Sequence, residues 1–457
     1  GSEMCIRDRL NTEQKFIFDK YKNGENVFLT GPGGTGKSFL IKTIVKDAGT
    51  DEKTLQVCAL TGCASILLNC KATTLHRFAG FGLANKPINE VVEEVFKKKY
   101  KLKNWFKLKC LIIDEVSMMS LKLLLILDAI GRKVYNKPNI PFGGLQVIFS
   151  GDFYQLPPVK SSDEEKEASM FCFEHPLWNE LFPAENQVVL KTIFRQEEAQ
   201  FLKVLKYVRQ GRITNTTKAS LESRLFKPSQ LEEIRKSKVV TIINPYKKDA
   251  ELINNRSYKE LGDVEKRTYN IKFLKNSSKK KDEPLEDELN NLRIASNASL
   301  KQDYEFLANN IMAENSLELK LGTHVMCIAN VDLNSENQIA NGSQGIVVGF
   351  EMGLPLVKFN NIEKPMLVGP FTWNSESNKN ISVSQIPLIY AWAITIHKAQ
   401  GVTLDAAIMD IGKNIFEYGQ TYVALSRVKT LEGLYLTSFD YTKIAANPKV
   451  KKFYGDD

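Results

Sequence analysis

The clearest chemical signature lies in residues 31–38, which read GPGGTGKS. This run fits the pattern G-x-x-x-x-G-K-S/T, and it stands directly between the apolar run 26–30 and a predicted helix. In such loops the glycines let backbone N–H groups close around phosphate oxygens, and the start of the helix adds a positive dipole. We expect ATP and Mg²⁺ here, with Lys37 on the β and γ phosphates and the Ser38 hydroxyl on the metal. The expected nucleotide ligands in this loop are Gly31, Gly33, Gly34, Thr35, Gly36, Lys37 and Ser38.

Two carboxylates follow another apolar run, CLIIDE at 110–115. A buried strand that ends in acidic residues places them at the carboxyl edge of a parallel sheet, where such sheets bind ligands. Asp114 is predicted to hold the magnesium ion, directly or through water, and Glu115 to polarise the attacking water as general base. Acidic residues often end strands, so the assignment depends on the phosphate loop upstream.

Two arginines are candidates to reach the γ-phosphate from a second domain. Arg195 lies in the run 191–196, KTIFRQ, and Arg427 lies in the run 420–428, QTYVALSRV. A guanidinium group stays charged, and its planar fork matches phosphate oxygens. Either residue could instead form an ordinary surface ion pair.

The chain alternates apolar, strand-like runs with helical stretches, which is typical of a parallel sheet covered on both faces. We expect a first domain at 10–185 and a second α/β domain at 186–258 and 387–457. The region 259–386 interrupts the second domain with polar sequence that is rich in Asn and Lys. Short β runs and turn signals within it predict a small β-barrel at about 317–383.

Composition adds weaker evidence. The chain has 457 residues, with 62 Lys and Arg against 53 Asp and Glu, and the net charge of +9 is compatible with a polyanionic partner. The seven cysteines form no Cys-x-x-Cys pair and are expected to be reduced thiols. No apolar run approaches the length of a membrane span and no signal peptide is visible, so we expect no membrane partner and a cytoplasmic or nuclear location. Residues 1–9, which begin Gly-Ser, look like the remnant of a tag and are expected to lie outside the fold.

Several further motifs occur in a fixed order. They are ALTGCA at 59–64, TTLHRFAG at 73–80, PFGGLQ at 141–146, GDFYQLPPV at 151–159, TIHKAQG at 395–401 and YVALSR at 422–427. Together with the phosphate loop, they resemble the motifs of Pif-type helicases of superfamily 1. The match covers nearly the whole chain from Leu10 onward.

This resemblance implies two RecA-like domains that use ATP to move 5′ to 3′ on single-stranded DNA and to unwind tailed duplex or fork DNA. It implies that Gln14 reads the adenine, that Gln155 senses the γ-phosphate, and that the second-domain arginines complete the site. The strand-splitting wedge is expected at about 86–104. The residues expected along the DNA are Thr61, Gly62, His76, Phe78, Pro157, His397 and Lys398.

The individual DNA contacts have alternatives. Lys398 suits a backbone phosphate and Phe78 suits the face of a base. Phe78 also lies in an apolar, helix-like stretch and is equally compatible with core packing, and His397 could cap a helix.

Two other functions also remain open at the level of sequence. One is a translocase that displaces proteins from single strands without unwinding duplex. The other is an ATP-switched binding module, although the complete set of hydrolytic residues is more typical of a motor. That set is Glu115, Gln155, Arg195 and Arg427.

Overall fold

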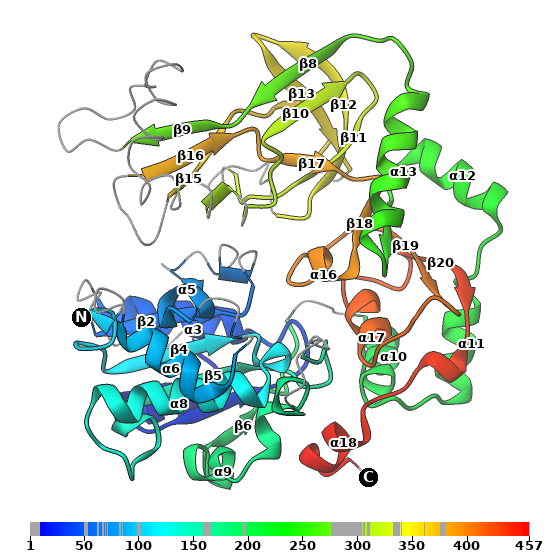
Figure 1. Ribbon diagram of the computed structural model, residues 1–457. Helices are drawn as coiled ribbons and strands as arrows, with labels where there is room; N and C mark the ends of the chain where they lie inside the picture. The colour runs from blue at the N-terminus through cyan, green and yellow to red at the C-terminus, as the bar shows by residue number, and fades with distance from the viewer. Residues whose placement is uncertain are drawn as a thin grey trace.

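The computed structural model describes most of the chain (Figure 1). The leader 1–9, Gly62 and Arg195 lie outside the described residues. The described residues are 10–49, 54–61, 64–65, 68, 70, 72–81, 84, 86–97, 102–158, 166–194, 198–275, 304, 307–308, 311–331, 339, 341–360, 362–374 and 381–456.

The first domain is built on a six-stranded sheet in the order β3-β2-β4-β5-β1-β6, and all its pairs are parallel. Strands β1 and β4 are buried along their whole length, as expected for a sheet that is covered on both faces. The predicted α/β class is therefore confirmed. The strands are β1 (Val27–Thr30), β2 (Leu55–Ala59), β3 (Thr73–Thr74), β4 (Cys110–Asp114), β5 (Gln146–Gly151) and β6 (Gln187–Val189).

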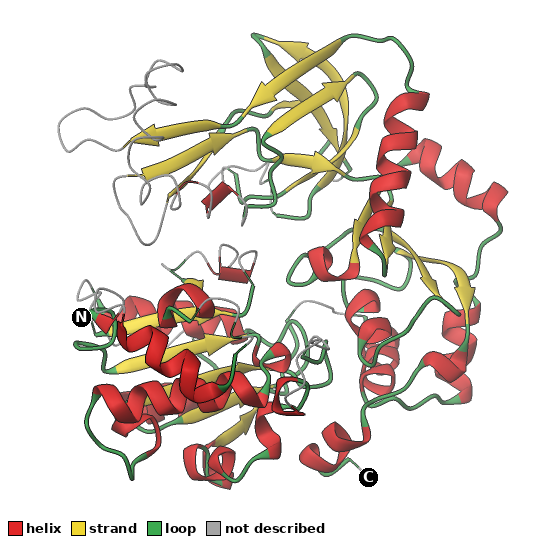
Figure 2. Cartoon of the chain, in the orientation of Figure 1, coloured by secondary structure: helices red, strands yellow, loops and turns green. Residues whose placement is uncertain are grey.

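Helices pack on both faces of this sheet (Figure 2). Alternation along β4 sends Ile112 into a cluster with Ile41 of α3, and Ile113 into a cluster with Leu127 of α8 on the other face. None of the helices in the described ranges is long and apolar enough to cross a membrane. The described helices that the N-terminal part of the chain contributes to this domain are α2 (Thr12–Lys22), α3 (Lys37–Ala48), α5 (Leu75–Ala79), α6 (Ile88–Lys97), α8 (Leu121–Val134) and α9 (Leu177–Leu181).

The second domain contains a smaller parallel sheet in the order β18-β7-β19-β20. Its strands come from two separate parts of the chain, as the sequence predicts. They are β7 (Thr241–Asn244), β18 (Ala393–Thr395), β19 (Ala407–Ile411) and β20 (Leu434–Phe439). The helices are α10 (Ala199–Arg209), α11 (Asn215–Glu222), α12 (Pro228–Ser237), α13 (Lys247–Glu260), α16 (Ile396–Ala399) and α17 (Gln420–Leu425).

Two domain boundaries differ from the prediction. The run that begins near 186 does not open the second domain, because β6 pairs in parallel with β1 and the Leu190 N–H donates to the Thr30 carbonyl at 2.7 Å. The last helix, α18 (Pro448–Tyr454), belongs to the first domain: Val450 joins its core, and the Tyr454 hydroxyl lies 2.6 Å from Thr30 Oγ1. Figure 1 shows α18 beside the first domain.

The inserted region is a small β domain, but its described strands do not close into the predicted barrel. They divide among a five-stranded sheet, β14-β13-β12-β11-β17, a three-stranded sheet, β15-β16-β9, and the pair β10-β8. Within the described residues, β14 and β17 remain separate edges of the larger sheet. The strands are β8 (Lys266–Asn270), β9 (Lys272–Lys275), β10 (Ser316–Lys320), β11 (His324–Cys327), β12 (Gln344–Glu351), β13 (Leu354–Phe359), β14 (Met366–Leu367), β15 (Phe371–Asn374), β16 (Ile381–Gln385) and β17 (Leu388–Tyr390).

The insert is anchored to the second domain by a buried glutamine. Gln344 Nε2 donates to Thr241 Oγ1 at 2.7 Å and to the Ala406 carbonyl at 2.9 Å. Met326 and Ile389 of the insert pack in the same hydrophobic cluster as Ile243 of β7. The two parts therefore share a continuous core.

Candidate active site

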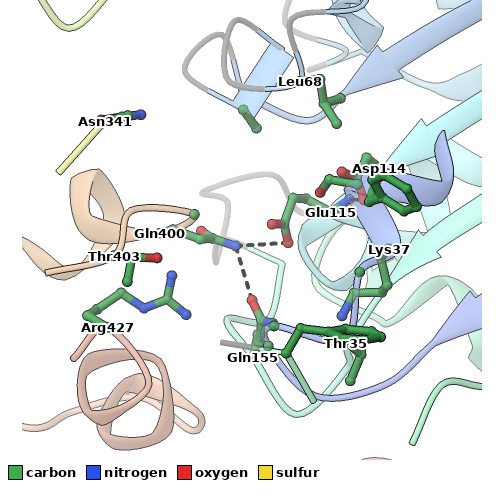
Figure 3. Close-up of a pocket in the computed structure, with 18 of the residues that line it drawn as sticks. Thr35, Lys37, Leu68, Asp114, Glu115, Gln155, Asn341, Gln400, Thr403 and Arg427 are labelled. Atoms are coloured by element: carbon green, nitrogen blue, oxygen red, sulfur yellow. Dashed lines mark hydrogen bonds between the residues drawn. The ribbon is translucent and has the colours of Figure 1, made fainter. Parts of the chain in front are cut away.

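A cavity of about 890 Å³ lies between the two domains. Figure 3 shows the phosphate loop and acidic residues on one side, and side chains of the second domain on the other. The cavity therefore gathers most of the predicted nucleotide site. The residues of the predicted nucleotide site that line it are Gln14, Gly33, Gly34, Thr35, Gly36, Lys37, Ser38, Asp114, Glu115, Gln155 and Arg427. Two residues predicted as DNA contacts, Thr61 and His397, line it as well.

The phosphate loop connects β1 to α3, and its backbone requires glycine at two positions. Gly31 has φ +143°, and a Cβ there would lie 2.4 Å from the Leu190 carbonyl oxygen. Gly36 has φ +84°, and a Cβ there would lie 2.7 Å from Gln14 Nε2. Side chains at these positions would be strained and would also collide with neighbouring atoms. The short distance to Gln14 also shows that this side chain, which is predicted to bind the adenine, lies against the loop.

Lys37 folds back onto the loop that precedes it. Its Nζ donates to the Gly31 carbonyl at 2.7 Å and to the Pro32 carbonyl at 2.9 Å. Burial lowers the pKa of Lys37, while the nearby carboxylates Asp152 and Glu115 act in the opposite direction. The ammonium is thus held inside the loop, where an entering phosphate group can accept hydrogen bonds from it.

Asp114 and Glu115 extend β4 into the cavity. Glu115 has φ +59°, a left-handed conformation that costs a residue with a side chain on the order of 1–3 kcal/mol and is concentrated at functional sites. Its N–H donates to Asp114 Oδ1 at 3.0 Å. Burial, followed by the neighbouring Asp114 carboxylate, raises the pKa of Glu115 to about 7. A carboxyl group with such a pKa can take up a proton near neutral pH.

The donors around the cavity fit a magnesium ion. Mg²⁺ prefers oxygen ligands and is commonly held by one or two carboxylates, with water and phosphate oxygens completing the shell. The Asp114 carboxylate and the Ser38 hydroxyl both line the cavity and supply such oxygens. Over the part of the chain that the structure describes, no group of three or more His, Cys, Asp or Glu side chains could hold a metal by itself.

Side chains of the second domain reach directly into the site. Gln400, just after α16, donates through Nε2 to Glu115 Oε2 at 3.0 Å, with a longer contact of 3.5 Å to Gln155 Oε1. The hydroxyl of Tyr422 in α17 accepts a hydrogen bond from the Gly33 N–H at 3.0 Å. The sequence assigned no role to Gln400 or Tyr422, although both lie inside recognised motifs. The signal that could have indicated a role for them is a polar side chain inside a recognised motif.

Of the two predicted arginines, the structure places Arg427 at the cavity. Its side chain is 2% exposed and donates to the Val423 carbonyl at 2.8 Å and the Ala399 carbonyl at 3.3 Å. Figure 3 shows the guanidinium group on the opposite side of the cavity from Lys37. Arg195 lies outside the described residues, so its position is not assigned.

The main chain of Gln155, the predicted γ-phosphate sensor, packs against the second domain. Gly419 precedes α17 with φ +78°, and a Cβ there would lie 2.4 Å from the Gln155 carbonyl oxygen. The start of α17 therefore packs on the main chain of the sensor. A movement between the domains would disturb this contact.

Comparison with known proteins identifies the family. The model of the PIF1-like helicase family matches residues 9–219, and the model of the 2B domain of DNA helicase Pif1 matches residues 304–350. The crystal structure of the Pif1 helicase from Candida albicans has 30% sequence identity and a TM-score of 0.68, over 98% of this chain and 99% of that chain. The chain belongs to the PIF1-like helicase family.

Other members of the family are similarly close. The ATP-dependent DNA helicase PIF1 of Danio rerio is 34% identical over 98% of this chain, and this chain spans 64% of its length. The Pif1 helicase from Bacteroides, solved in complex with ADP-AlF3 and single-stranded DNA, has 29% identity and a TM-score of 0.58 over 98% of each chain.

The predicted DNA contacts of this PIF1-like chain divide into two groups. His397 and Lys398 are exposed on α16, and His76 and Pro157 are partly exposed. Phe78 is different: it is 2% exposed, and its ring centroid lies 5.0 Å from that of Trp105. Burial in the core favours packing over base stacking for Phe78, which agrees with its place in an apolar helix.

Proposed function

We propose that this chain is an ATP-dependent DNA helicase that moves 5′ to 3′ on single-stranded DNA and unwinds duplex DNA. The observation that carries the proposal is the shared cavity, where the phosphate loop of one domain faces Gln400 and Arg427 of the other. A nucleotide bound between two domains can change their separation as it is hydrolysed. Such a cycle suits a motor in DNA replication, repair or recombination.

The positions of the first-domain residues support the following proposed roles. Lys37 binds the phosphate tail, Glu115 accepts a proton from the attacking water, and Gln155 senses the γ-phosphate. Ser38 and Asp114 would hold Mg²⁺, which would neutralise phosphate charge. Arg427, together with Arg195, stabilises the charge that develops on the transferred phosphoryl group.

The DNA is proposed to cross α16 and the neighbouring motifs of the first domain. Exposed Lys398 is suited to a phosphate, and His397 lies beside it. The proposed contacts in the first domain are His76, Pro157 and the run 61–62. The predicted wedge segment contains α6, which packs against α8. The Bacteroides relative was solved with single-stranded DNA, which supports the same ligand here.

The energies are compatible with unwinding. Stacking in DNA contributes about 0.6–2.2 kcal/mol per base-pair step. Coupling between two protein sites is typically about 1–3 kcal/mol. One ATP-driven closure can therefore offset the opening of a base-pair step, without any contact that reads base sequence.

Matched partial duplexes test the function and its direction. At low salt, the protein with ATP and Mg²⁺ is expected to separate a duplex with a 5′ single-stranded tail and to leave one with only a 3′ tail intact. Lys37→Ala serves as the control for ATP dependence. Equal or greater unwinding of the 3′-tailed duplex contradicts the direction, and no unwinding of either contradicts the helicase assignment.

A further inference from the structure

We propose that Gln400 is a positioning residue that restrains hydrolysis until DNA binds. In the restrained state its amide occupies the oxygens of Glu115 and Gln155 that must hold the attacking water. This inference rests on the proposed function and adds a mechanism by which DNA controls the same site.

The geometry places Gln400 between the two hydrolytic groups. Its Nε2 lies 3.0 Å from Glu115 Oε2 and 3.5 Å from Gln155 Oε1. Figure 3 shows the side chain extending from the second domain to both partners. The contact therefore crosses the cleft and depends on the relative position of the domains.

This contact competes with catalysis. A general base must lie within hydrogen-bond distance of the proton that it removes, either directly or through one water. When Glu115 is ionised, as a general base must be, an amide that donates to its carboxylate forms a charge-assisted hydrogen bond, which is about twice as strong as a neutral one. While Gln400 donates to that oxygen, it occupies one of the lone pairs of Glu115 that could accept the proton of the attacking water, and its amide fills space that the water needs.

The position of Gln400 in the chain supplies the link to DNA. It caps the C-terminus of α16, a helix of four residues that also carries His397 and Lys398. The N–H of Lys398 donates to Thr395 Oγ1 at 3.1 Å, and the N–H of Gln400 donates to the His397 carbonyl at 3.2 Å. A DNA phosphate that binds Lys398 and shifts it would therefore also shift Gln400, because Lys398 lies in this short, hydrogen-bonded helix and Gln400 caps it.

The test compares ATP hydrolysis by the full chain with and without oligo(dT). Gln400→Ala is expected to raise kcat in the absence of DNA about tenfold, the scale for releasing one hydrogen bond to a charged acceptor. The rate with saturating oligo(dT) should change less, so the stimulation ratio falls. Gln400→Asn keeps a shorter amide and should give a smaller rise.

Gln200→Ala is the matched control, because this exposed glutamine on α10 donates to Ser220 Oγ at 3.0 Å, away from the cavity. Its DNA-free rate should equal that of the wild type. General structural damage lowers hydrolysis, so a rise in kcat separates release from misfolding. A DNA-free rate of Gln400→Ala at or below the wild-type rate overturns the inference. Lack of stimulation of the wild type by oligo(dT) instead contradicts the proposed function.

Discussion

Asp152 of the first domain and Arg209 of the second form a two-point ion pair. Arg209 Nη2 lies 2.8 Å from Asp152 Oδ1, and Nε lies 2.9 Å from Oδ2. The Asp152 side chain is fully buried, and the guanidinium carbon lies 4.5 Å from the centroid of the Tyr154 ring. Because Gln155 follows in the same loop, this pair connects α10 to the proposed γ-phosphate sensor.

Breaking this pair is expected to destabilise the protein. Arg209→Ala leaves a buried, unpaired carboxylate, and such changes typically cost about 3–5 kcal/mol. Denaturant unfolding measures the loss. Arg256→Ala, which removes an exposed pair with Glu260, is the control and should have little effect. Equal stability of Arg209→Ala and wild type would show that the pair is not important for the fold.

Phe78 is expected to contribute to stability rather than to DNA binding. Phe78→Ala removes a buried ring that packs on Trp105, and deletions of this kind cost about 3–5 kcal/mol. The affinity of the folded protein for oligo(dT) should stay close to that of the wild type. Weaker DNA binding with unchanged stability would instead restore Phe78 to the DNA contacts.

Lys398 is expected to behave in the opposite way. Lys398→Ala should leave thermal stability unchanged, because the side chain is exposed. Loss of one phosphate contact should reduce the slope of log affinity against log salt by about 1. Fluorescence anisotropy with labelled oligo(dT) over a salt series measures this slope. An unchanged slope would place the DNA elsewhere.

Arg427→Ala is expected to retain ATP binding and to lose turnover. Arginines that stabilise phosphoryl transfer contribute about 10³–10⁵ in rate, although a γ-phosphate sensor can contribute less. Arg427→Lys keeps the charge without the planar fork and should recover little activity. Both variants need a melting curve, because the guanidinium also donates to the Ala399 carbonyl. Near-normal turnover would remove Arg427 from the mechanism.

The parts of the site that were predictable from sequence are local in the chain. Residues 31–38 are the phosphate loop and the start of α3, and Asp114 ends β4 with Glu115 directly after it, so spacing alone carries the information. Pairings between distant residues carry no such signal. The contact of Gln400 with Glu115 and the ion pair of Arg209 with Asp152 depend on how two domains meet.

The errors in the fold have related causes. The run 187–189 has the composition of any strand, and only its parallel pairing with β1 assigns it to the first sheet. The return of α18 to the first domain depends on Val450 and on the Tyr454 hydroxyl, which contacts Thr30 across the whole length of the chain. For Phe78, an apolar helix was compatible with both packing and stacking, and burial decided between them.

The most direct test of the central claim is the rate of ATP hydrolysis measured with and without single-stranded DNA. If the cavity between the domains drives a DNA motor, oligo(dT) will increase the kcat of the wild type. Lys37→Ala will hydrolyse no ATP while still binding oligo(dT), because the Lys37 ammonium is held inside the phosphate loop by the Gly31 and Pro32 carbonyls and is proposed to act on phosphates of the nucleotide. Hydrolysis that does not respond to single-stranded DNA, or equal loss of hydrolysis and DNA binding in Lys37→Ala, would contradict this account.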